Sequence, residues 1–317
     1  MTIRSRLREG VSGRGWLVCR LWACRGGVGV ALVVVGVFYT LTRTYTDYLL
    51  RSLEGPIEED NPELLRYIRA ELLKPPSSEP YNLLGKKNIA SREPEKSEMF
   101  YNETLRTLFN GKRGGFFVEA GALDGETMSN TLWLEQEAAW EGLLVEADHI
   151  AFLELVSKHR RAWVANVCLA PNPYPSKEMF SILPHFPGPM AWGLGFKTRA
   201  MHGLTRFSSN KAIGNSWFQK VQCVPLESLL LAMGVTRVDL LVLDVEGAEL
   251  AILGHFDLQK FDVQVVCVEW KKADELDEVS RQLSERGYQE AARDFEDLIL
   301  IKKGSEFQGR LPKNRRR

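Results

Sequence analysis

Two short apolar runs of the sequence end in acids, and the first is also followed by glycines. Glu119 closes the run FFVEA ahead of Gly121 and Gly125, and Glu146 closes the run GLLVE. Glycine allows a tight turn and a close approach of the backbone to a ligand. A carboxylate at the end of a strand can accept hydrogen bonds from both hydroxyls of a ribose. The two motifs in this order predict a nucleoside site.

The spacing of the first motif narrows the class of nucleoside. The pattern E-x-G-x-x-x-G lacks one glycine of the G-x-G-x-x-G motif, in which the second glycine lets the backbone approach a pyrophosphate. A nucleoside without a pyrophosphate, such as S-adenosylmethionine, does not require that second approach. The spacing therefore favours this kind of ligand over a dinucleotide.

Buried strands of an α/β domain would position these residues. Apolar runs bounded by Gly, Asp or Glu and separated by helical patterns are typical of a parallel sheet buried on both faces. The predicted fold is α/β, a doubly wound and mostly parallel Rossmann-like sheet, in which ligands bind at the carboxyl ends of the strands. The predicted strands are 116–120, 143–147, 163–169, 238–245, 263–270 and 297–301, the last one parallel or antiparallel, and a helix covers 274–287.

Five segments of this domain resemble the FkbM-type S-adenosylmethionine-dependent methyltransferases. They are VEAGALDGE, GLLVEAD, VPLESLL, LLVLDVEGAEL and VVCVEW, within residues 97–303, and D-V-E-G-A-E is the most specific. The resemblance implies a class I methyltransferase fold with S-adenosylmethionine as cofactor. It implies that Gly121 and Gly125 line the methionine end of the cofactor, Glu146 the ribose, and Asn166 to Cys168 the adenine edge.

Acids close to the transferred methyl group are the candidate catalytic residues. For a hydroxyl acceptor, a methyltransferase orients the nucleophile and helps to remove its proton. Asp244, Glu246 and Glu269 are the candidate bases, and Asp244 would also contact the cofactor. Asp244 and Glu246 also precede a predicted helix, where capping and the helix dipole alone favour acids, so a structural role is the alternative.

One loop departs from the family pattern D-x-G-A-N-x-G. Leu123 replaces the usual polar residue of this pattern, and Asp124 follows it. Leu123 removes a side chain that could hydrogen-bond to the cofactor. Asp124 adds a carboxylate that would attract a sulfonium.

Within the family, the chain is similar to the Star proteins. This resemblance rests on two sequence phrases, NTLWLE and VCLAP, and on an N-terminal anchor followed by a stem. It implies a non-catalytic trafficking factor that escorts membrane cargo, such as growth-factor precursors, from the endoplasmic reticulum to the Golgi and endosomes. Two functions therefore stand: membrane-anchored methyl transfer, with an O-methyl product, in the secretory pathway, and Star-like escort of cargo.

The N-terminal region predicts a membrane anchor. Residues 1–25 form a basic tail with six arginines and one acid, and residues 26–42 carry no charge. A helix over 26–42 spans about 25 Å, and the positive-inside rule puts the basic tail in the cytosol. The predicted protein is a single-pass type II membrane protein of the endoplasmic reticulum, Golgi, endosome or plasma membrane. An arginine-rich mitochondrial presequence is the alternative.

The remaining chain divides into a stem, a domain and a tail. Residues 43–97 form the stem with a short amphipathic helix after Asn61, residues 98–304 the methyltransferase-like domain, and residues 305–317 a basic tail. Asn102 begins a glycosylation sequon, which is meaningful in a lumenal domain. The irregular segment 171–220 predicts a lid or recognition surface, with a disordered insertion as the alternative. Lys+Arg and Asp+Glu both total 41, so no nucleic-acid partner is predicted.

Three cysteines of the domain fall in or beside predicted strands. Cys168, Cys223 and Cys267 form no CxxC and have no histidine at metal spacing, so no metal site is predicted. In a lumenal domain a pair such as Cys168 and Cys223 could form a disulfide. Three small buried hydrophobic residues are the alternative.

Overall fold

The structure is a computed structural model, and it describes residues 29–30, 32–41, 53, 57–84, 96–182, 202–207, 217–269, 273–294 and 296–310. The chain divides into two compact units, residues 1–52 and 53–317. In the first unit, residues 29–30 and 32–41 are helical, and their apolar side chains, such as Val33 and Phe38, are exposed. The rest of the predicted span 26–42 lies outside the described residues. None of the described helices combines the length and the apolar composition that crossing a membrane requires.

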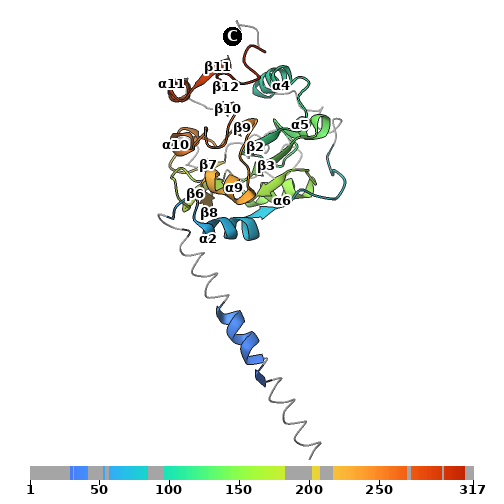
Figure 1. The fold of residues 1–317 in the computed structure, drawn as a ribbon, viewed down its shortest axis with the longest axis vertical. Coiled ribbons are helices and arrows are strands. Elements are labelled where there is room, and N and C mark those ends of the chain that lie inside the picture. The colour runs from blue at the N-terminus through green and yellow to red at the C-terminus, as the bar shows by residue number, and fades with distance from the viewer. Residues whose placement is uncertain are drawn as a thin grey trace, which may run out of the picture. The chain divides into compact units, whose positions relative to one another are not determined.

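An eight-stranded mixed sheet forms the centre of the second unit (Figure 1). Its five middle strands run parallel, while the edge strands β1, β12 and β11 pair antiparallel. In spatial order the strands are β1 (Leu73–Lys74), β4 (Trp163–Ala165), β3 (Glu141–Val145), β2 (Phe116–Ala120), β9 (Leu240–Leu243), β10 (Val265–Glu269), β12 (Asp297–Lys302) and β11 (Tyr288–Arg293). The α/β prediction is confirmed, and the last strand predicted from the sequence is antiparallel.

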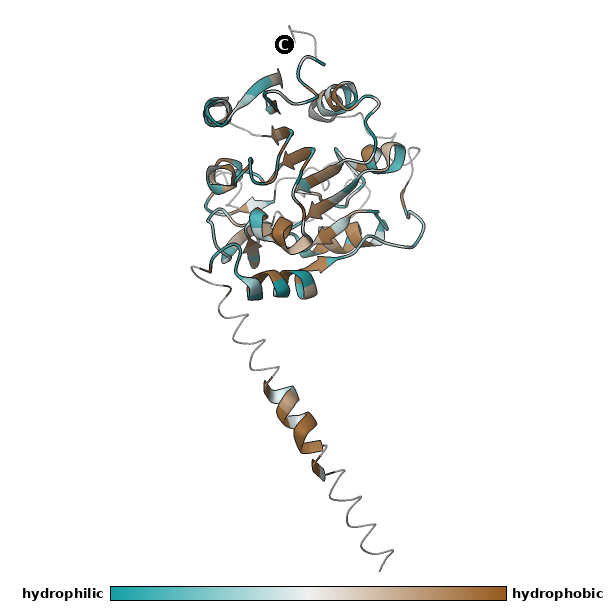
Figure 2. Cartoon of the chain, viewed as in Figure 1, coloured by the Kyte–Doolittle hydropathy of each residue, from teal (hydrophilic) through white to brown (hydrophobic). Residues whose placement is uncertain are grey.

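Both faces of this sheet are buried, because successive side chains along a strand point to opposite faces. In β9, Leu241 and Leu243 belong to one core cluster, whereas Leu240 and Val242 belong to the other. The first face packs against α2 (Pro62–Tyr67), α9 (Leu226–Met233), α10 (Glu249–His255) and α11 (Ala273–Glu285). The second face packs against α4 (Lys96–Leu108), α5 (Leu132–Ala138) and α6 (His149–Ser157). Figure 2 shows the hydrophobic residues gathered on the central strands.

Residues 57–84, predicted as part of a stem, pack against the core of the second unit. Asn61 caps α2 as predicted, because its side chain accepts hydrogen bonds from the backbone N–H groups of Glu63 and Leu64. The helix continues as the π-helical turn η1 (Ile68–Leu72), and β1 then pairs with β4. Leu64 and Ile68 are fully buried. These residues therefore belong to the folded unit.

A second, four-stranded sheet lies beside the central one, and the sequence did not predict it. Its order is β5 (Cys168–Leu169), β8 (Trp217–Val224), β6 (Ser176–Ile182) and β7 (Gly203–Leu204). The predicted strand 163–169 is therefore split between two sheets, since β4 ends at Ala165 and β5 pairs with β8. Strands β6 and β8 form the two ends of segment 171–220, which was predicted to be irregular. Residues 183–201 and 208–216 of that segment lie outside the described residues.

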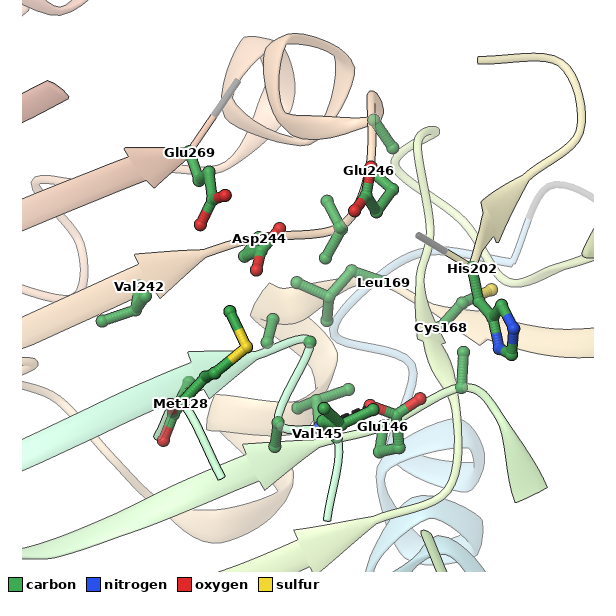
Figure 3. Close-up of a pocket in the computed structure, with 18 of the residues that line it drawn as sticks. Met128, Val145, Glu146, Cys168, Leu169, His202, Val242, Asp244, Glu246 and Glu269 are labelled. Atoms are coloured by element: carbon green, nitrogen blue, oxygen red, sulfur yellow. Dashed lines mark hydrogen bonds between the residues drawn. The ribbon is translucent and has the colours of Figure 1, made fainter. Parts of the chain in front are cut away.

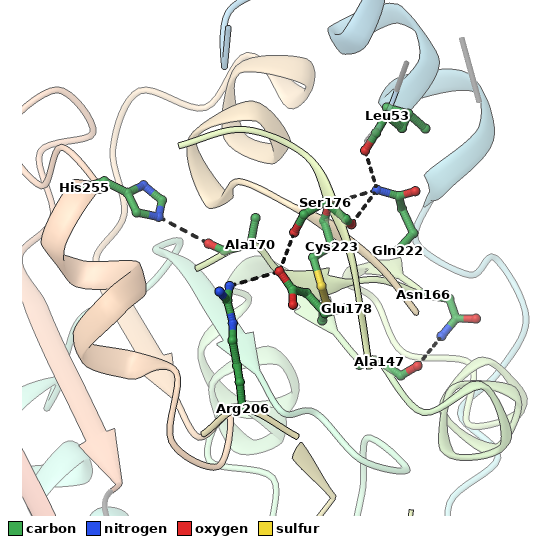
Figure 4. The surroundings of a disulfide bond; sticks show 11 residues. Leu53, Ala147, Asn166, Ala170, Ser176, Glu178, Arg206, Gln222, Cys223 and His255 are labelled. Carbon is green, nitrogen blue, oxygen red and sulfur yellow. Dashed lines mark hydrogen bonds and ion pairs between the residues drawn. A yellow bond between two sulfur atoms is a disulfide. The ribbon is translucent and has the colours of Figure 1, made fainter. Parts of the chain in front are cut away.

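A disulfide joins Cys168 of β5 to Cys223 of β8 (Figure 4). Cys267 is a free, buried cysteine. The two bonded cysteines are register partners in the second sheet. At the C-terminus, Phe307 is fully buried in the core on the second face of the central sheet. The basic tail predicted from residue 305 therefore starts within the folded unit, and residues 311–317 lie outside the described residues.

Candidate functional site

A cavity lies at the carboxyl ends of β2, β3, β9 and β10 (Figure 3). In the sheet, the crossovers after β2 run in opposite directions, first to β3 and later to β9, and such a switch point leaves a crevice for a ligand. Seven of the nine residues predicted for the site line this cavity: Glu119, Gly121, Glu146, Cys168, Asp244, Glu246 and Glu269. The topology therefore brings most of the predicted site together.

Gly121 makes the closest backbone approach in the cavity. Its φ is +88°, and a Cβ atom at this position would overlap the carbonyl oxygen of Asp244. The N–H of Gly121 donates to the carbonyl of Val145 (3.0 Å), and the N–H of Asp244 donates to the carbonyl of Ala120 (3.0 Å). Only glycine fits between the loops that follow β2 and β9. Because Gly121 has no side chain, these two loops stay in contact in the cavity wall.

Three residues of the cavity wall that are not glycine have a left-handed backbone. The φ angles are +50° at Leu123, +61° at Met128 and +59° at Glu246, and all three residues line the cavity. This conformation is costly for side chains with a Cβ, and such strain concentrates at functional sites. The local folding of this wall is therefore determined by the packing around it, not by local preference.

Glu146 is buried between the loops that follow β2 and β3. Its carboxylate accepts hydrogen bonds from the N–H groups of Leu123 (2.7 Å) and Asp148 (2.8 Å). Burial raises the pKa of this carboxyl from 4.5 to about 7, against the stabilising backbone hydrogen bonds. A carboxylate has about four acceptor positions, so acceptor capacity remains for a ligand hydroxyl. This arrangement fits the predicted contact with a ribose.

Glu119 holds the loop that leads to α5. Its carboxylate accepts hydrogen bonds from Ser129 Oγ (3.0 Å), the N–H of Asn130 (2.8 Å) and Thr131 Oγ1. Burial raises the pKa of Glu119, and the nearby Arg160 guanidinium opposes that shift. Because three donors from the loop already use this carboxylate, Glu119 positions the cavity wall.

Two acids and a tyrosine meet at one end of the cavity. Leu243 of β9 is the register partner of Val268 of β10, so Asp244 and Glu269 follow at the same level of the sheet. Figure 3 shows their side chains side by side. Tyr101 of α4 also lines the cavity; burial and the nearby acids, Asp244 and Glu269 among them, raise the pKa of its hydroxyl well above 10. The Tyr101 hydroxyl is buried and finds no hydrogen-bond partner among the described residues.

Glu246 packs against Gly203 of β7, and Glu249 supports the turn that carries Glu246. The Glu249 carboxylate accepts hydrogen bonds from the N–H groups of Val245 (2.8 Å) and Gly247 (2.9 Å) at the start of α10. Burial, and to a smaller extent the charge of Glu246, raise the pKa of Glu249 to about 8. Glu249 therefore shapes the turn, while Glu246 lines the cavity.

The opposite end of the cavity is mostly apolar. Its walls come from the second sheet and the segment before it, through Val167, Leu169, Phe180 and Leu204. Glu246 packs against Gly203 at this end, and His202 is a second polar residue here. His202 Nδ1 lies 3.1 Å from Asp148 Oδ2, and its Nε2 is buried without a hydrogen-bond partner among the described residues. Figure 3 shows His202 and Cys168 together, away from Asp244 and Glu269.

Two predicted cofactor residues do not line the cavity. Gly125 packs against Leu155 of α6, and no helix starts there, because α5 begins only at Leu132. The Asn166 side chain donates to the carbonyl of Glu146 (2.9 Å) and pairs with His149 Nδ1 (2.7 Å).

Asp124 was expected to attract a sulfonium, but it is buried outside the cavity lining. It accepts hydrogen bonds from the backbone of Glu126 and from Thr127. Gly125, Asn166 and Asp124 therefore support the loops around the cavity.

Sequence reasoning missed Tyr101 and His202 as cavity residues. Tyr101 shares the helical spacing of Leu105 and Leu108, so the pattern indicated only a core position. His202 lies in the segment predicted to be irregular, and its partner Asp148 belongs to a distant part of the sequence. No local signal connects these two residues.

The charge of the cavity defines the ligand class that fits it. Its lining, as far as the structure describes it, holds five acids and no lysine or arginine: Glu119, Glu146, Asp244, Glu246 and Glu269. A phosphate would be repelled here, whereas a cationic ligand would be attracted. Together with the α/β fold and the site at the switch point, this charge suits the cofactor of a methyltransferase-like domain.

Residues 119–290 match the family model of the methyltransferase FkbM domain, and this is more than half of the chain. The chain therefore belongs to the FkbM methyltransferase family. No curated protein sequence matches it.

Several solved structures of methyltransferases are similar to the chain at low sequence identity. Methyltransferase FkbM from Methylobacillus flagellatus KT has 13% identity and a TM-score of 0.37, over 68% of this chain and 57% of that chain. The human methyltransferase 10 domain containing protein has 12% identity and a TM-score of 0.35, over 66% and 83% of the two chains. The METTL16 MTase domain has 10% identity and a TM-score of 0.36, over 76% and 77%. The chain thus spans less than two thirds of the Methylobacillus protein.

Proposed function

We propose that this protein is a membrane-anchored, S-adenosylmethionine-dependent methyltransferase of the secretory pathway that forms O-methyl products. The acid-lined cavity at the switch point of an FkbM-family domain is the observation that carries the proposal. S-adenosylmethionine combines a ribose, a sulfonium, an ammonium and one carboxylate, so its net charge is positive, and it has no phosphate. Five acids without a lysine or arginine among the described lining residues suit that charge.

The chain's residues would divide the work along the cavity. Glu146 accepts hydrogen bonds from the ribose, and the loop at Gly121 holds the backbone close to the ligand. Bound S-adenosylmethionine supplies an electrophilic methyl group. Asp244 and Glu269 lie at the acidic end, where one of them takes the proton of the acceptor hydroxyl as its oxygen attacks in line. The acceptor is a hydroxyl of a sugar or a carboxylate of a secretory substrate.

Calorimetry on the full-length chain in detergent tests this function. We expect saturable binding of S-adenosylmethionine and none of NAD, because the described lining offers its pyrophosphate acids and no lysine or arginine. Glu146→Ala should weaken binding at least about tenfold through the lost charged hydrogen bonds. Glu141→Ala is the matched control, because Glu141 is exposed at the opposite end of the same strand. A folded chain that binds neither ligand would refute the proposal.

We also propose the type II topology, with residues 26–42 as the span and the domain in the lumen. The disulfide between Cys168 and Cys223 supports this, since such bonds persist in oxidising compartments. The location is the endoplasmic reticulum, Golgi, endosome or plasma membrane. In sealed microsomes the domain should resist added protease, and digestion without detergent would contradict the topology. Import into mitochondria would instead support the presequence alternative.

The sequon at Asn102 gives a second measurement of topology. Asn102 is exposed on α4, whereas Thr104 is fully buried, so a glycan has to be attached before the helix packs. A glycosidase-sensitive mass shift that disappears in Asn102→Gln would support a lumenal domain.

A Star-like escort function is the second candidate, and one surface observation favours it. Met179, Trp217 and Phe218 expose apolar side chains on β6 and β8 of the second sheet, where a partner protein could bind. The cargo would be a membrane protein such as a growth-factor precursor. The double variant Gly121→Arg, Glu146→Ala separates the functions: unchanged cargo export supports escort, and lost export supports dependence on the cavity.

A further inference from the structure

A buried histidine and aspartate form a hydrogen-bonded pair at the apolar end of the cavity. His202 Nδ1 lies 3.1 Å from Asp148 Oδ2, and each side chain is only 5% exposed. Asp148 belongs to the turn after β3, and its N–H donates to Glu146 Oε1 (2.8 Å). The ring of Phe180 contacts His202 edge to face, with 6.4 Å between the centroids. The same turn therefore fixes the ribose-binding carboxylate and the imidazole.

The second ring nitrogen of His202, Nε2, has no hydrogen-bond partner among the described residues. Nε2 is buried, and the ring lines the cavity. Because the Asp148 carboxylate can only accept, the neutral form of His202 carries its proton on Nδ1. Nε2 is then a hydrogen-bond acceptor. A buried acceptor without a donor is costly, and it points to a donor on a ligand.

The charges of the cavity decide which part of the ligand reaches His202. This step rests on the proposed function. A ribose held at Glu146 extends its base in one direction and its sulfonium in the other. The sulfonium and ammonium belong near Asp244 and Glu269, and the flat base belongs between the apolar walls beside His202 (Figure 3).

We propose that His202, positioned by Asp148, is the residue that selects adenine over other purines. Its Nε2 accepts a hydrogen bond from the exocyclic amine of the base. Hypoxanthine carries an oxygen at that position, and two acceptors would face each other. Asp148 does not touch the base; it is a positioning residue that sets the tautomer.

Binding of two ligands that differ only in this group tests the proposal. S-adenosylhomocysteine and S-inosylhomocysteine are titrated into the full-length chain in detergent by calorimetry. We expect the unchanged protein to prefer the adenine ligand about tenfold or more. In His202→Phe, the affinity for S-adenosylhomocysteine should fall about tenfold and the preference should disappear. His255→Phe is the matched control, because His255 is largely buried outside the cavity lining.

Asp148→Asn tests whether Asp148 sets the tautomer of His202. A merely structural role of Asp148 would not change the preference between the two ligands. The N–H of Ile150 donates to Asp148 Oδ1 (2.9 Å), so the amide oxygen of the variant stays on that side and its NH₂ group faces His202 Nδ1. Nδ1 must then accept, and the proton moves to Nε2. Nε2 becomes a donor, and we expect the preference to shift toward S-inosylhomocysteine.

The remaining outcomes separate a failure of the proposed function from a failure of the role assigned to His202. If the unchanged protein binds neither ligand, the proposed function itself fails. If it binds both equally, or prefers hypoxanthine, the role of His202 is wrong while the function stands. If His202→Phe leaves both affinities unchanged and slows methyl transfer, His202 acts on the acceptor, and the proposal is overturned. A melting temperature measured for each variant separates lost binding from lost folding.

Discussion

At the scale of single residues, Leu123 is the clearest conflict between side chain and backbone. Its φ of +50° disfavours a leucine, whereas asparagine, the family's usual residue there, tolerates this conformation. We therefore expect Leu123→Asn to raise the free energy of unfolding by about 0.5–1 kcal/mol. Urea denaturation followed by circular dichroism measures this. A lower stability would mean that the leucine side chain contributes packing that outweighs the strain.

The pKa of Glu146 predicts how ligand binding depends on pH. Ligand hydroxyls donate to the ionised carboxylate, and this group ionises at about 7 in the free protein. The affinity for S-adenosylhomocysteine should therefore rise as the pH increases from 6 to 7 and become constant above 8, with proton release on binding below 7. Calorimetry in buffers of different ionisation enthalpy measures both. Glu146→Gln should lose this part of the pH dependence, and an identical slope in that variant would contradict the assignment.

The raised pKa of Glu146 makes the folded state less stable at high pH, whereas ligand binding becomes stronger there. The folded-state pKa of Glu146 lies above its ordinary value of 4.5, so the folded state holds the proton more tightly than the unfolded state. The stability from this group is fully present below pH 4.5 and is lost as the pH rises through 7. Ligand hydrogen bonds to the ionised carboxylate then offset part of this loss, which couples binding to stability at neutral pH.

At the scale of elements, Gly121 joins the loops after β2 and β9. Gly121→Ala places a Cβ against the carbonyl oxygen of Asp244 and requires a positive φ as well. Gly234→Ala is the matched control, because Gly234 also has a positive φ, of +72°, but has open space around it. We expect the control to cost about 1 kcal/mol and Gly121→Ala at least about twice that, with loss of ligand binding. Equal costs in denaturant titrations would show that the two loops separate easily.

The elements that sequence reasoning located are those with a strong local signal. Strand β2 matches its predicted range 116–120, because apolar residues fill it and glycines follow it. The second sheet could not be predicted, because β6 pairs with β8 across a long segment without periodicity. The change of sheet between β4 and β5 also follows from that distant pairing, and no residue near Ala165 signals it.

At the scale of the whole molecule, the site also divides into residues with a local sequence signal and residues placed by distant packing. Acids and glycines at strand ends were predictable, because every parallel strand brings its carboxyl end to one edge of the sheet. The contributions of Tyr101 and His202 were not predictable, because each residue comes from an element whose position depends on packing. Gly125 packs against Leu155 and the Asn166 side chain donates to the carbonyl of Glu146, so neither residue lines the cavity. Strand ends identify a site, and tertiary packing decides which side chains enter it.

The boundary of the folded unit gives the last prediction. Leu64, Ile68 and Leu73, which precede the predicted domain, are buried in its core. Arg69 Nε donates to the carbonyl of Ala232 (2.7 Å), and Tyr81 donates to Glu135 (2.9 Å). Truncating one buried leucine or isoleucine to alanine costs about 2–5 kcal/mol, whereas a whole domain has only about 5–15 kcal/mol. Residues 57–84 therefore contribute a large fraction of the domain's stability.

Two truncated chains measure this contribution. A chain that starts at residue 53 keeps the whole second unit and should unfold cooperatively in urea. A chain that starts at residue 85 loses β1, α2 and their buried side chains, so it should lack a cooperative transition or aggregate. Both chains lack residues 26–42, so the comparison does not depend on a membrane anchor. Equal free energies of unfolding would show that residues 57–84 contribute nothing to the domain's stability and act as a stem, as the sequence alone predicted.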